Sequence, residues 1–158
     1  MFRRIEAGDD AAIAKIIRDN LEASKLDIPG TAYFDDTLDH LSQFYLVSPK
    51  TRFYYIGEEE GRVFAGVGLA ECPYYENCAE LQKLYLADWA KGKGLGYQLM
   101  KLIEAKAIEL GYHSLYLETH TNLEIAMHLY ERCGYECIEK PEAIVHSAMN
   151  RFYRKELR

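Results

Sequence analysis

Three closely spaced glycines lie in the segment 91–96, whose sequence is KGKGLG. Before it, residues 78–86 (CAELQKLYL) alternate in polarity and predict a strand. After it, apolar residues recur at helical spacing from Leu95 to Leu110, and Gly111 ends the pattern. A strand, a glycine turn and a helix must therefore follow one another here. Because the start of a helix leaves N–H groups unpaired and carries partial positive charge, the turn predicts a cradle for an anion such as phosphate.

The glycine spacing excludes one phosphate-binding loop and argues against another. A Walker A loop is excluded, since no Gly-Lys-Ser/Thr follows at the required spacing. A dinucleotide-binding fingerprint needs G-x-G-x-x-G, whereas this chain has G-x-G-x-G. Glu118, about 22 residues beyond Gly96, stands where that fingerprint places its ribose-binding acid, but some 90 residues precede the turn. A nicotinamide-dependent oxidoreductase is kept as an alternative, and so is a plain surface loop.

The rest of the chain predicts a mixed α/β domain that spans residues 1–158. Asp9 is a candidate N-cap for a helix whose apolar positions run from Ile13 to Leu21. The strand, helix, strand order between 78 and 118 predicts a parallel strand pair. Two antiparallel strands are predicted at 52–57 and 62–71, with Glu-Glu-Glu-Gly as the turn between them. The other predicted elements are strands at 2–5, 114–118, 135–138 and 151–157 and helices at 35–47 and 123–133.

Charge and composition narrow the range of partners. The chain carries 19 Lys and Arg against 25 Asp and Glu, a net charge of −6, without a basic run that could follow a phosphate backbone. We therefore expect no nucleic-acid partner. No apolar stretch approaches the roughly 20 residues of a membrane span, so we expect no membrane partner and a cytoplasmic location. The four cysteines, spaced C-x5-C and C-x3-C, do not match a metal site, so reduced thiols and no metal are expected.

Two segments together resemble a known family. The strand AELQKLYL leading to KGKGLG resembles the acyl-CoA-binding motif Gln/Arg-x-x-Gly-x-Gly/Ala of the GNAT superfamily of N-acetyltransferases. Residues 129–135 (LYERCGY) resemble its second hallmark, Leu-Tyr-x-x-x-Gly-Phe/Tyr, in the expected order. The resemblance implies a mostly antiparallel sheet flanked by helices, in which two splayed parallel strands, 78–86 and 114–118, hold acetyl-CoA. Lys91 departs from the motif, because it offers a point charge where Gln or Arg is usual.

The resemblance also implies that an amine attacks the acetyl-CoA thioester directly, in a ternary complex. Tyr130, in the second hallmark, would protonate the departing thiolate, although its helical spacing also suits a core aromatic. Glu80 matches the position of an acidic base, with an ordinary strand glutamate as the alternative, and His120, Glu118 and water are weaker candidates. The resemblance implies two sets of residues that bind the co-substrate. The pantetheine arm would bind Leu84, Tyr85 and Leu86, and the diphosphate would bind Lys91, Gly92, Lys93, Gly94, Leu95, Gly96 and Tyr97. Asn122 is a further implied contact, although it stands eight residues before Tyr130, where a spacing of seven is usual.

The amine acceptor is less determined than the co-substrate. Acidic residues around Pro29-Gly30, among them Asp27, Asp35 and Asp36, suit a cationic amine or form only a polar loop between helices. We therefore expect a small-molecule or peptide amine. A non-catalytic CoA-binding or interaction module is the alternative to an enzyme, and an exposed edge strand would allow a homodimer.

Overall fold

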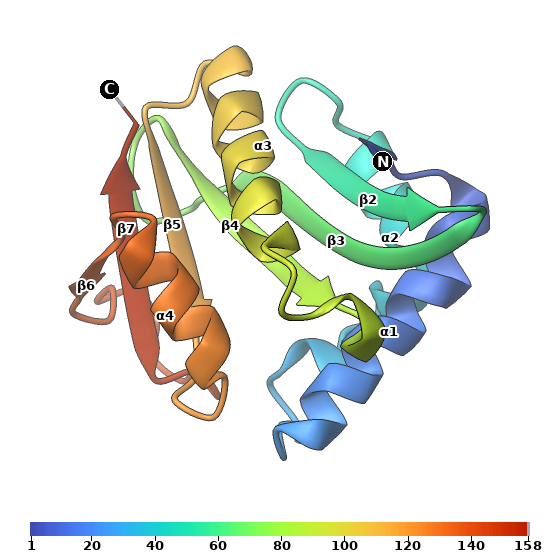
Figure 1. Ribbon diagram of the computed structural model, residues 1–158. Coiled ribbons are helices and arrows are strands. Elements are labelled where there is room, and N and C mark those ends of the chain that lie inside the picture. The colour runs from blue at the N-terminus through green and yellow to red at the C-terminus, as the bar shows by residue number, and fades with distance from the viewer. Residues whose placement is uncertain (158) are drawn as a thin grey trace.

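Seven strands form one sheet in the computed structural model, which describes residues 1–157 (Figure 1). Every neighbouring pair is antiparallel except β4 and β5, which are parallel, and the order is β1-β2-β3-β4-β5-β7-β6. This arrangement confirms the mixed α/β fold with one parallel pair. The strands are β1 (Phe2–Arg4), β2 (Phe53–Glu59), β3 (Arg62–Glu71), β4 (Cys78–Leu86), β5 (Ser114–Thr119), β6 (Glu136–Ile138) and β7 (Arg151–Glu156).

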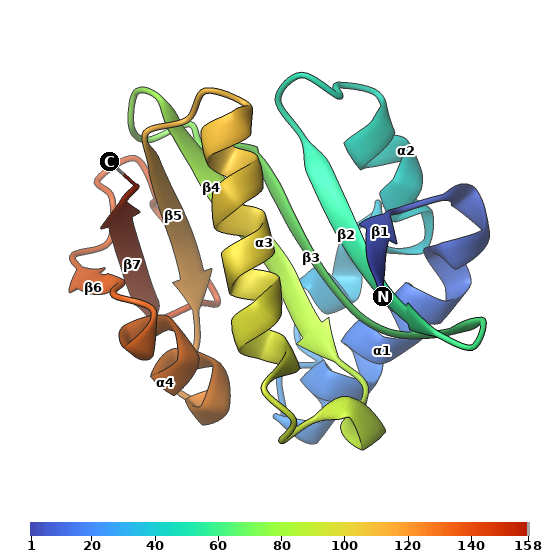
Figure 2. The ribbon, with the colours of Figure 1, turned by 45° about the horizontal axis from the view of Figure 1, so that its top comes forward.

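Helices cover both faces of the sheet (Figure 2). Residues of α3 and α4, such as Leu99 and Tyr130, share one apolar cluster with β3, β4 and β5, while α1 and α2 share a second with β2. Within residues 1–157, no helix is long and apolar enough to cross a membrane. The α-helices are α1 (Asp10–Ala23), α2 (Leu41–Leu46), α3 (Leu95–Glu109) and α4 (Glu124–Arg132), and the 3-10 turns are η1 (Ala7–Asp9), η2 (Ala32–Phe34), η3 (Leu38–His40) and η4 (Asp88–Ala90).

The parallel strands β4 and β5 are paired over only part of their length. Three residue pairs are in register, from Cys78 opposite Ser114 to Glu80 opposite Tyr116. Beyond Glu80 the strands diverge toward the end of the sheet where α3 begins (Figure 1). This divergence matches the splayed pair that the family resemblance implies.

A bulge in β4 lies within the diverging part. Two residues, Lys83 and Leu84, oppose a single residue of β3, and Lys83 has a φ of +51°, which lysine rarely adopts. Tyr54 Oη donates a hydrogen bond to the Lys83 carbonyl at 2.7 Å, which holds the bulge in place. Because the extra residue shifts the alternation of side chains, Leu81 and Leu84 both pack in the α3 cluster, whereas Tyr85 packs toward α1 and α2.

The helix predicted at 35–47 is wrong in its first half. Only Leu41–Leu46 is α-helical, and the turns η2 and η3 precede it. Asp10 of α1 accepts hydrogen bonds from the Ser42 backbone N–H at 2.9 Å and from the Ser42 hydroxyl at 2.7 Å. This contact satisfies a free N–H in the first turn of α2 and so fixes where the helix begins. Apolar spacing within the segment cannot reveal such a tertiary contact.

Of two local predictions near turns, the hairpin turn needs correction and the N-cap residue is confirmed in position. β2 continues to Glu59, and the turn consists of Glu60 and Gly61, whose φ values of +51° and +77° are typical of a type I′ hairpin. Asp9 does occupy the N-cap position of α1, but its carboxylate makes no capping bond to that helix. It accepts instead from the Glu6 N–H and the Arg3 guanidinium, at 2.8 Å each, and the Arg3 hydrogen bond lowers the pKa of Asp9.

The four cysteines form no disulfide with one another. Cys72, Cys78 and Cys133 are buried, and Cys137 is exposed. Within residues 1–157, no three His, Cys, Asp or Glu side chains gather closely enough to hold a metal ion.

Gly66 of β3 provides a test of the packing around the bulge. A Cβ at this position would lie 2.4 Å from Tyr54 Cε1, and the Tyr54 ring is fully buried. We expect Gly66→Ala to lower the free energy of unfolding by about 1–3 kcal/mol, because the ring cannot move without distorting its neighbours. Urea denaturation measures the change. Gly8→Ala is the control, since no atom lies within 4 Å of the added Cβ; equal effects of the two substitutions would contradict the packing argument.

Candidate active site

The glycine turn joins β4 to α3 through η4. Gly92 and Gly94 have φ values of +77° and +78°, so both occupy the left-handed region that glycine adopts without strain. Gly94 is the N-cap of α3, and the first helical hydrogen bond runs from the Gln98 N–H to its carbonyl at 3.3 Å. The N–H groups of residues 95–97 precede this bond and remain as donors for an anion.

Two lysines add positive charge beside these donors. Lys91 Nζ lies 2.9 Å from Asp88 Oδ1, and Lys93 Nζ lies 6.0 Å from the centroid of the Trp89 ring. Both lysines are exposed. Backbone donors and the positive end of α3 therefore lie at residues 94–97, and the two lysines beside them contact η4, an arrangement that suits a diphosphate.

The start of α3 packs closely against α4. A Cβ at Gly96 would lie 3.2 Å from Leu129 Cδ2, so the absent side chain lets the two helices approach. Gly96 ends the first sequence motif, and Leu129 begins the second. The two motifs thus form one structural unit, in which the glycine turn lies beside the helix that carries Tyr130.

The end of β4 forms one side of the diverging strands, and α1 is tied to it. Asn20 Nδ2 of α1 donates to the Leu86 carbonyl at 2.9 Å and to the Ile16 carbonyl at 2.8 Å. Leu86 is one of the residues that the resemblance implies for the pantetheine arm, and its carbonyl therefore already has a protein partner. Sequence reasoning missed Asn20, because a single polar residue in an amphipathic helix does not show which strand it will meet.

Glu80 lies where β4 and β5 are last paired, opposite Tyr116. Its carboxylate accepts a hydrogen bond from Gln82 Nε2 at 3.1 Å, and Tyr116 Oη donates to Glu118 at 2.9 Å. Burial raises the pKa of Glu80 to about 7, the Gln82 hydrogen bond opposes the increase, and the charge of Glu118 adds to it. A carboxyl group that titrates near neutral pH is suited to accept a proton.

Tyr130 is buried on the inner side of α4. Its ring centroid lies 6.2 Å from those of both Tyr135 and Tyr153. Burial raises the pKa of the phenol, and nearby Tyr85 of β4 adds to the increase. The phenol is therefore protonated at neutral pH. This position agrees with both interpretations of the sequence, a core aromatic and a proton donor close to the diverging strands.

Asn122 and His120 lie in the turn between β5 and α4. Asn122 Nδ2 donates to the Ser24 carbonyl at 3.0 Å, and the Asn122 backbone N–H donates to His120 Nδ1, also at 3.0 Å. Both side chains thus take part in this turn and its contact with the end of α1. The side chain of Asn122 is directed to α1 rather than to the glycine turn.

The loop that carries the predicted acceptor-binding acids lies against β4 and the loop before β7. Asp35 Oδ2 is 3.2 Å from Lys83 Nζ in the bulge. Gly30 packs against Ala148, since a Cβ at Gly30 would lie 3.2 Å from Ala148 Cβ. The ion pair with Lys83 reduces the negative charge that Asp35 can offer to a cationic amine.

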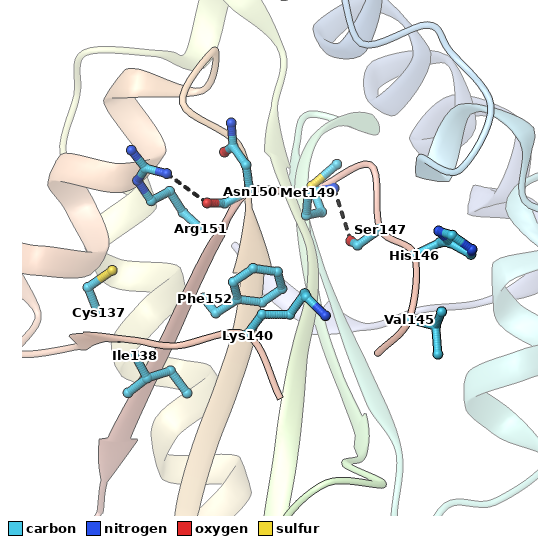
Figure 3. A pocket seen from close by; sticks show the side chains of 10 residues that line it. All are labelled: Cys137, Ile138, Lys140, Val145, His146, Ser147, Met149, Asn150, Arg151 and Phe152. Atoms are coloured by element: carbon cyan, nitrogen blue, oxygen red, sulfur yellow. Dashed lines mark hydrogen bonds between the residues drawn. The ribbon is translucent and has the colours of Figure 1, made fainter. Parts of the chain in front are cut away.

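Two surface hollows lie outside the glycine turn. One, of about 620 Å³, lies beside β6 and β7, and Figure 3 shows Phe152 among its lining side chains. Phe152 is the strand partner of Glu118 on β5, so this hollow adjoins β5, the strand that pairs with β4 at Glu80. The other, of about 740 Å³, lies between α1 and Trp89.

Known proteins share this sequence pattern and this fold. The acetyltransferase (GNAT) family model matches residues 12–135. The chain is 37% identical over 145 residues to the uncharacterized N-acetyltransferase YjgM of Escherichia coli K12, across 88% of this chain and 83% of that protein. A GNAT-family acetyltransferase of Staphylococcus aureus Mu50 has a TM-score of 0.84 at 16% identity, over 100% of this chain and 99% of that one. YncA of Salmonella typhimurium, solved with its cofactor acetyl-CoA, has a TM-score of 0.77 at 18% identity, over 100% of this chain and 94% of that one.

The raised pKa of Glu80 makes stability depend on pH. Its carboxyl group titrates near 4.5 when unperturbed and near 7 in the folded chain, so the folded chain binds more protons between these values. Stability is therefore lost as the pH rises through this interval. Glu80→Gln removes that loss, and we expect the variant to gain up to about 3 kcal/mol relative to wild type between about pH 4 and pH 8.

Urea denaturation of both proteins at the two pH values measures this gain. Glu59→Gln, which neutralises an exposed carboxylate at the end of β2, is the control and should show a much smaller change. If the difference in stability between Glu80→Gln and wild type were the same at both pH values, the Glu80 carboxyl could not have the raised pKa described above.

Proposed function

The chain belongs to the acetyltransferase (GNAT) family, and we propose that it moves an acetyl group from acetyl-CoA to a primary amine by direct attack in a ternary complex. One observation carries the proposal: β4 and β5 diverge immediately beyond Glu80, between the glycine turn and α4. Strands that separate leave backbone N–H and C=O groups without a strand partner, and an extended amide-containing arm can bind to them.

The chain's own residues bind and orient the co-substrate, which supplies an activated thioester. The N–H groups of residues 95–97 hold the diphosphate, and Lys91 and Lys93 add charge at the turn. Backbone groups of Leu84 and Tyr85 hold the pantetheine arm, since Asn20 already occupies the Leu86 carbonyl. We do not assign Asn122 to this site, because its side chain binds the Ser24 carbonyl.

Glu80 serves as the base. An alkyl amine with a pKa of about 10.4 is almost wholly protonated at neutral pH and cannot attack a carbonyl carbon. Glu80 accepts the ammonium proton, directly or through one water molecule, and the freed lone pair then forms the new C–N bond. A pKa of about 7 supports this role, because the carboxylate is substantially ionised at neutral pH and is more basic than an exposed glutamate.

Tyr130 serves as the proton donor to the leaving group. When the C–S bond breaks, the electron pair stays on sulfur, and Tyr130 Oη supplies the proton that converts the thiolate to a thiol. The new amide nitrogen loses its second proton in the same step, and this proton restores the Tyr130 phenol, directly or through water. Burial keeps the phenol protonated until that step. Tyr85, whose charge would raise the pKa of the same phenol, is on β4 and is itself one of the residues whose backbone is proposed to hold the pantetheine arm.

The two alternative functions have less support. A nicotinamide-dependent oxidoreductase of the dinucleotide-binding type needs a mostly parallel sheet, whereas only β4 and β5 are parallel here. Glu118, its proposed ribose ligand, accepts a hydrogen bond from Tyr116. A non-catalytic CoA-binding module would have no use for a half-buried carboxyl group that titrates near neutral pH.

Substitution of Gly94 tests the diphosphate site. Gly94→Ala places a side chain in the left-handed region and strains the turn, so we expect acetyl-CoA affinity to fall about tenfold in titration calorimetry. Gly61→Ala is the matched control, because Gly61 has a φ of +77° and, like Gly94, no atom within 4 Å of its Cβ position. Equal acetyl-CoA affinities of the two variants would place the diphosphate elsewhere. If the wild-type protein bound NAD and not acetyl-CoA in the same experiment, the oxidoreductase would be favoured.

Substitution of Tyr130 tests the proton donor. We expect Tyr130→Phe to lower kcat for thiol release, measured with acetyl-CoA and a panel of primary amines, by about 10²-fold. The acetyl-CoA Kd should change little, because the ring and its packing are retained. Tyr153→Phe is the control, since it removes another buried phenol hydroxyl, one that donates to Glu131 on α4. Unchanged kcat in Tyr130→Phe would leave the tyrosine as a core aromatic only.

A further inference from the structure

Glu80 is the end of a chain of hydrogen bonds that begins in another element of the fold. Tyr45 Oη of α2 donates to Gln82 Oε1 at 2.6 Å, and Gln82 Nε2 donates to Glu80 Oε1 at 3.1 Å. Gln82 and Glu80 are two residues apart on β4, so their side chains lie on the same face of the sheet. This series of hydrogen bonds therefore connects the proposed base to the core beneath α2.

The phenol at the start of this chain is held in place by its surroundings. Tyr45 is fully buried, and its ring centroid lies 5.0 Å from that of Tyr54. Gly68 is the strand partner of Gln82, and a Cβ at Gly68 would lie 2.9 Å from Tyr45 Oη. The missing side chain on β3 thus leaves the space through which Tyr45 reaches Gln82.

The hydrogen bonds all run in one direction, from Tyr45 toward Glu80. Burial raises the pKa of Tyr45 well above its usual value, so its hydroxyl keeps its proton and donates it to an acceptor. The acceptor is the Gln82 carbonyl oxygen, and the Gln82 amide group must then turn its NH2 toward Glu80. An NH2 group can only donate, and a carboxylate is a better acceptor than a neutral carboxyl group.

We propose that Tyr45 and Gln82 are positioning residues for Glu80, which fix the orientation of its carboxyl group and favour the ionised form that can accept a proton. Tyr45 acts through Gln82, because it prevents the amide from turning over and presenting its oxygen to the carboxylate. The inference rests on the proposed role of Glu80 as the base.

Other groups around Glu80 determine how much this hydrogen bond matters. Burial and the charge of Glu118 on β5 favour the neutral form, and Lys83 of β4 opposes them. Lys83 is itself paired with Asp35 at 3.2 Å, which reduces its effect. The remaining titratable side chains that interact with Glu80 are Tyr45 of α2, Tyr74 of the loop before β4, and Tyr116 of β5. Lys83 is thus partly neutralised, and the Gln82 NH2 is the contact that most favours the charged form.

An NMR titration of the whole chain with ¹³C-labelled glutamate side chains tests the proposal without any substrate. Glu80→Gln identifies the Glu80 resonance by its disappearance. Tyr45→Phe lets the amide turn over, and Gln82→Met removes the donor while keeping a similar volume. We expect each to move the Glu80 midpoint upward from about 7 by roughly one pH unit.

Two further variants control for effects of folding and charge. Tyr153→Phe removes a buried phenol hydroxyl on β7, which donates to Glu131 rather than to a neighbour of Glu80, and should leave the Glu80 midpoint unchanged. Glu118→Gln removes a neighbouring negative charge and should move the midpoint downward. An unchanged midpoint in both Tyr45→Phe and Gln82→Met overturns the proposal. A shift in Gln82→Met alone overturns the role of Tyr45, because Gln82 would then act without it.

Failure of the proposed function would appear in a different measurement. If Glu80→Gln kept the wild-type turnover with an amine substrate, Glu80 would not be the base, whatever its titration showed. If Glu80 is the base, the acidic limb of the kcat profile should move upward in Tyr45→Phe by the same amount as the NMR midpoint. Protonation of the free amine is identical for all variants, so it cannot produce such a difference.

Discussion

The divergence of β4 from β5 beyond the Glu80–Tyr116 pair is the constraint on which the rest of the site depends. The bulge at Lys83, held by the Tyr54 hydroxyl, changes the direction of β4 where it leaves its parallel neighbour. The glycine turn then begins α3 at the open end, and contact between Gly96 and Leu129 brings α4 beside it. Anion donors, a half-buried carboxyl group and a buried phenol are thereby gathered around one opening in an otherwise continuous sheet.

The same arrangement has a cost in stability. A carboxyl group with a pKa near 7 destabilises the folded chain at neutral pH, and a core built for stability alone would place an uncharged residue there. The hydrogen bond from Gln82 recovers part of this loss. A carboxyl group whose pKa lies near neutral pH is a stronger base than an exposed glutamate, which suits the role in proton transfer proposed for Glu80.

Local rules account for the parts of the fold and site that were predicted from sequence. The glycine turn, the parallel pair and the type of most elements follow from backbone preferences and apolar spacing near each residue. The helix at 35–47 was predicted too long because the contact between Asp10 and Ser42 decides where α2 begins. Neither Asn20 nor Tyr45 could be assigned to the site, because each reaches β4 from a distant segment. Asn20 lies 66 residues before its partner Leu86, and Tyr45 lies 37 residues before its partner Gln82.

Hydrogen exchange with and without acetyl-CoA tests most directly whether the opening holds the co-substrate. The backbone N–H groups of residues 92–97 should exchange more slowly when acetyl-CoA is present, because the free donors at the start of α3 then bind its diphosphate. Amides of the hairpin turn at Glu60 and Gly61 should not change. Exchange at 92–97 that stays the same at saturating acetyl-CoA would contradict the account, because the glycine turn would then have no part in binding.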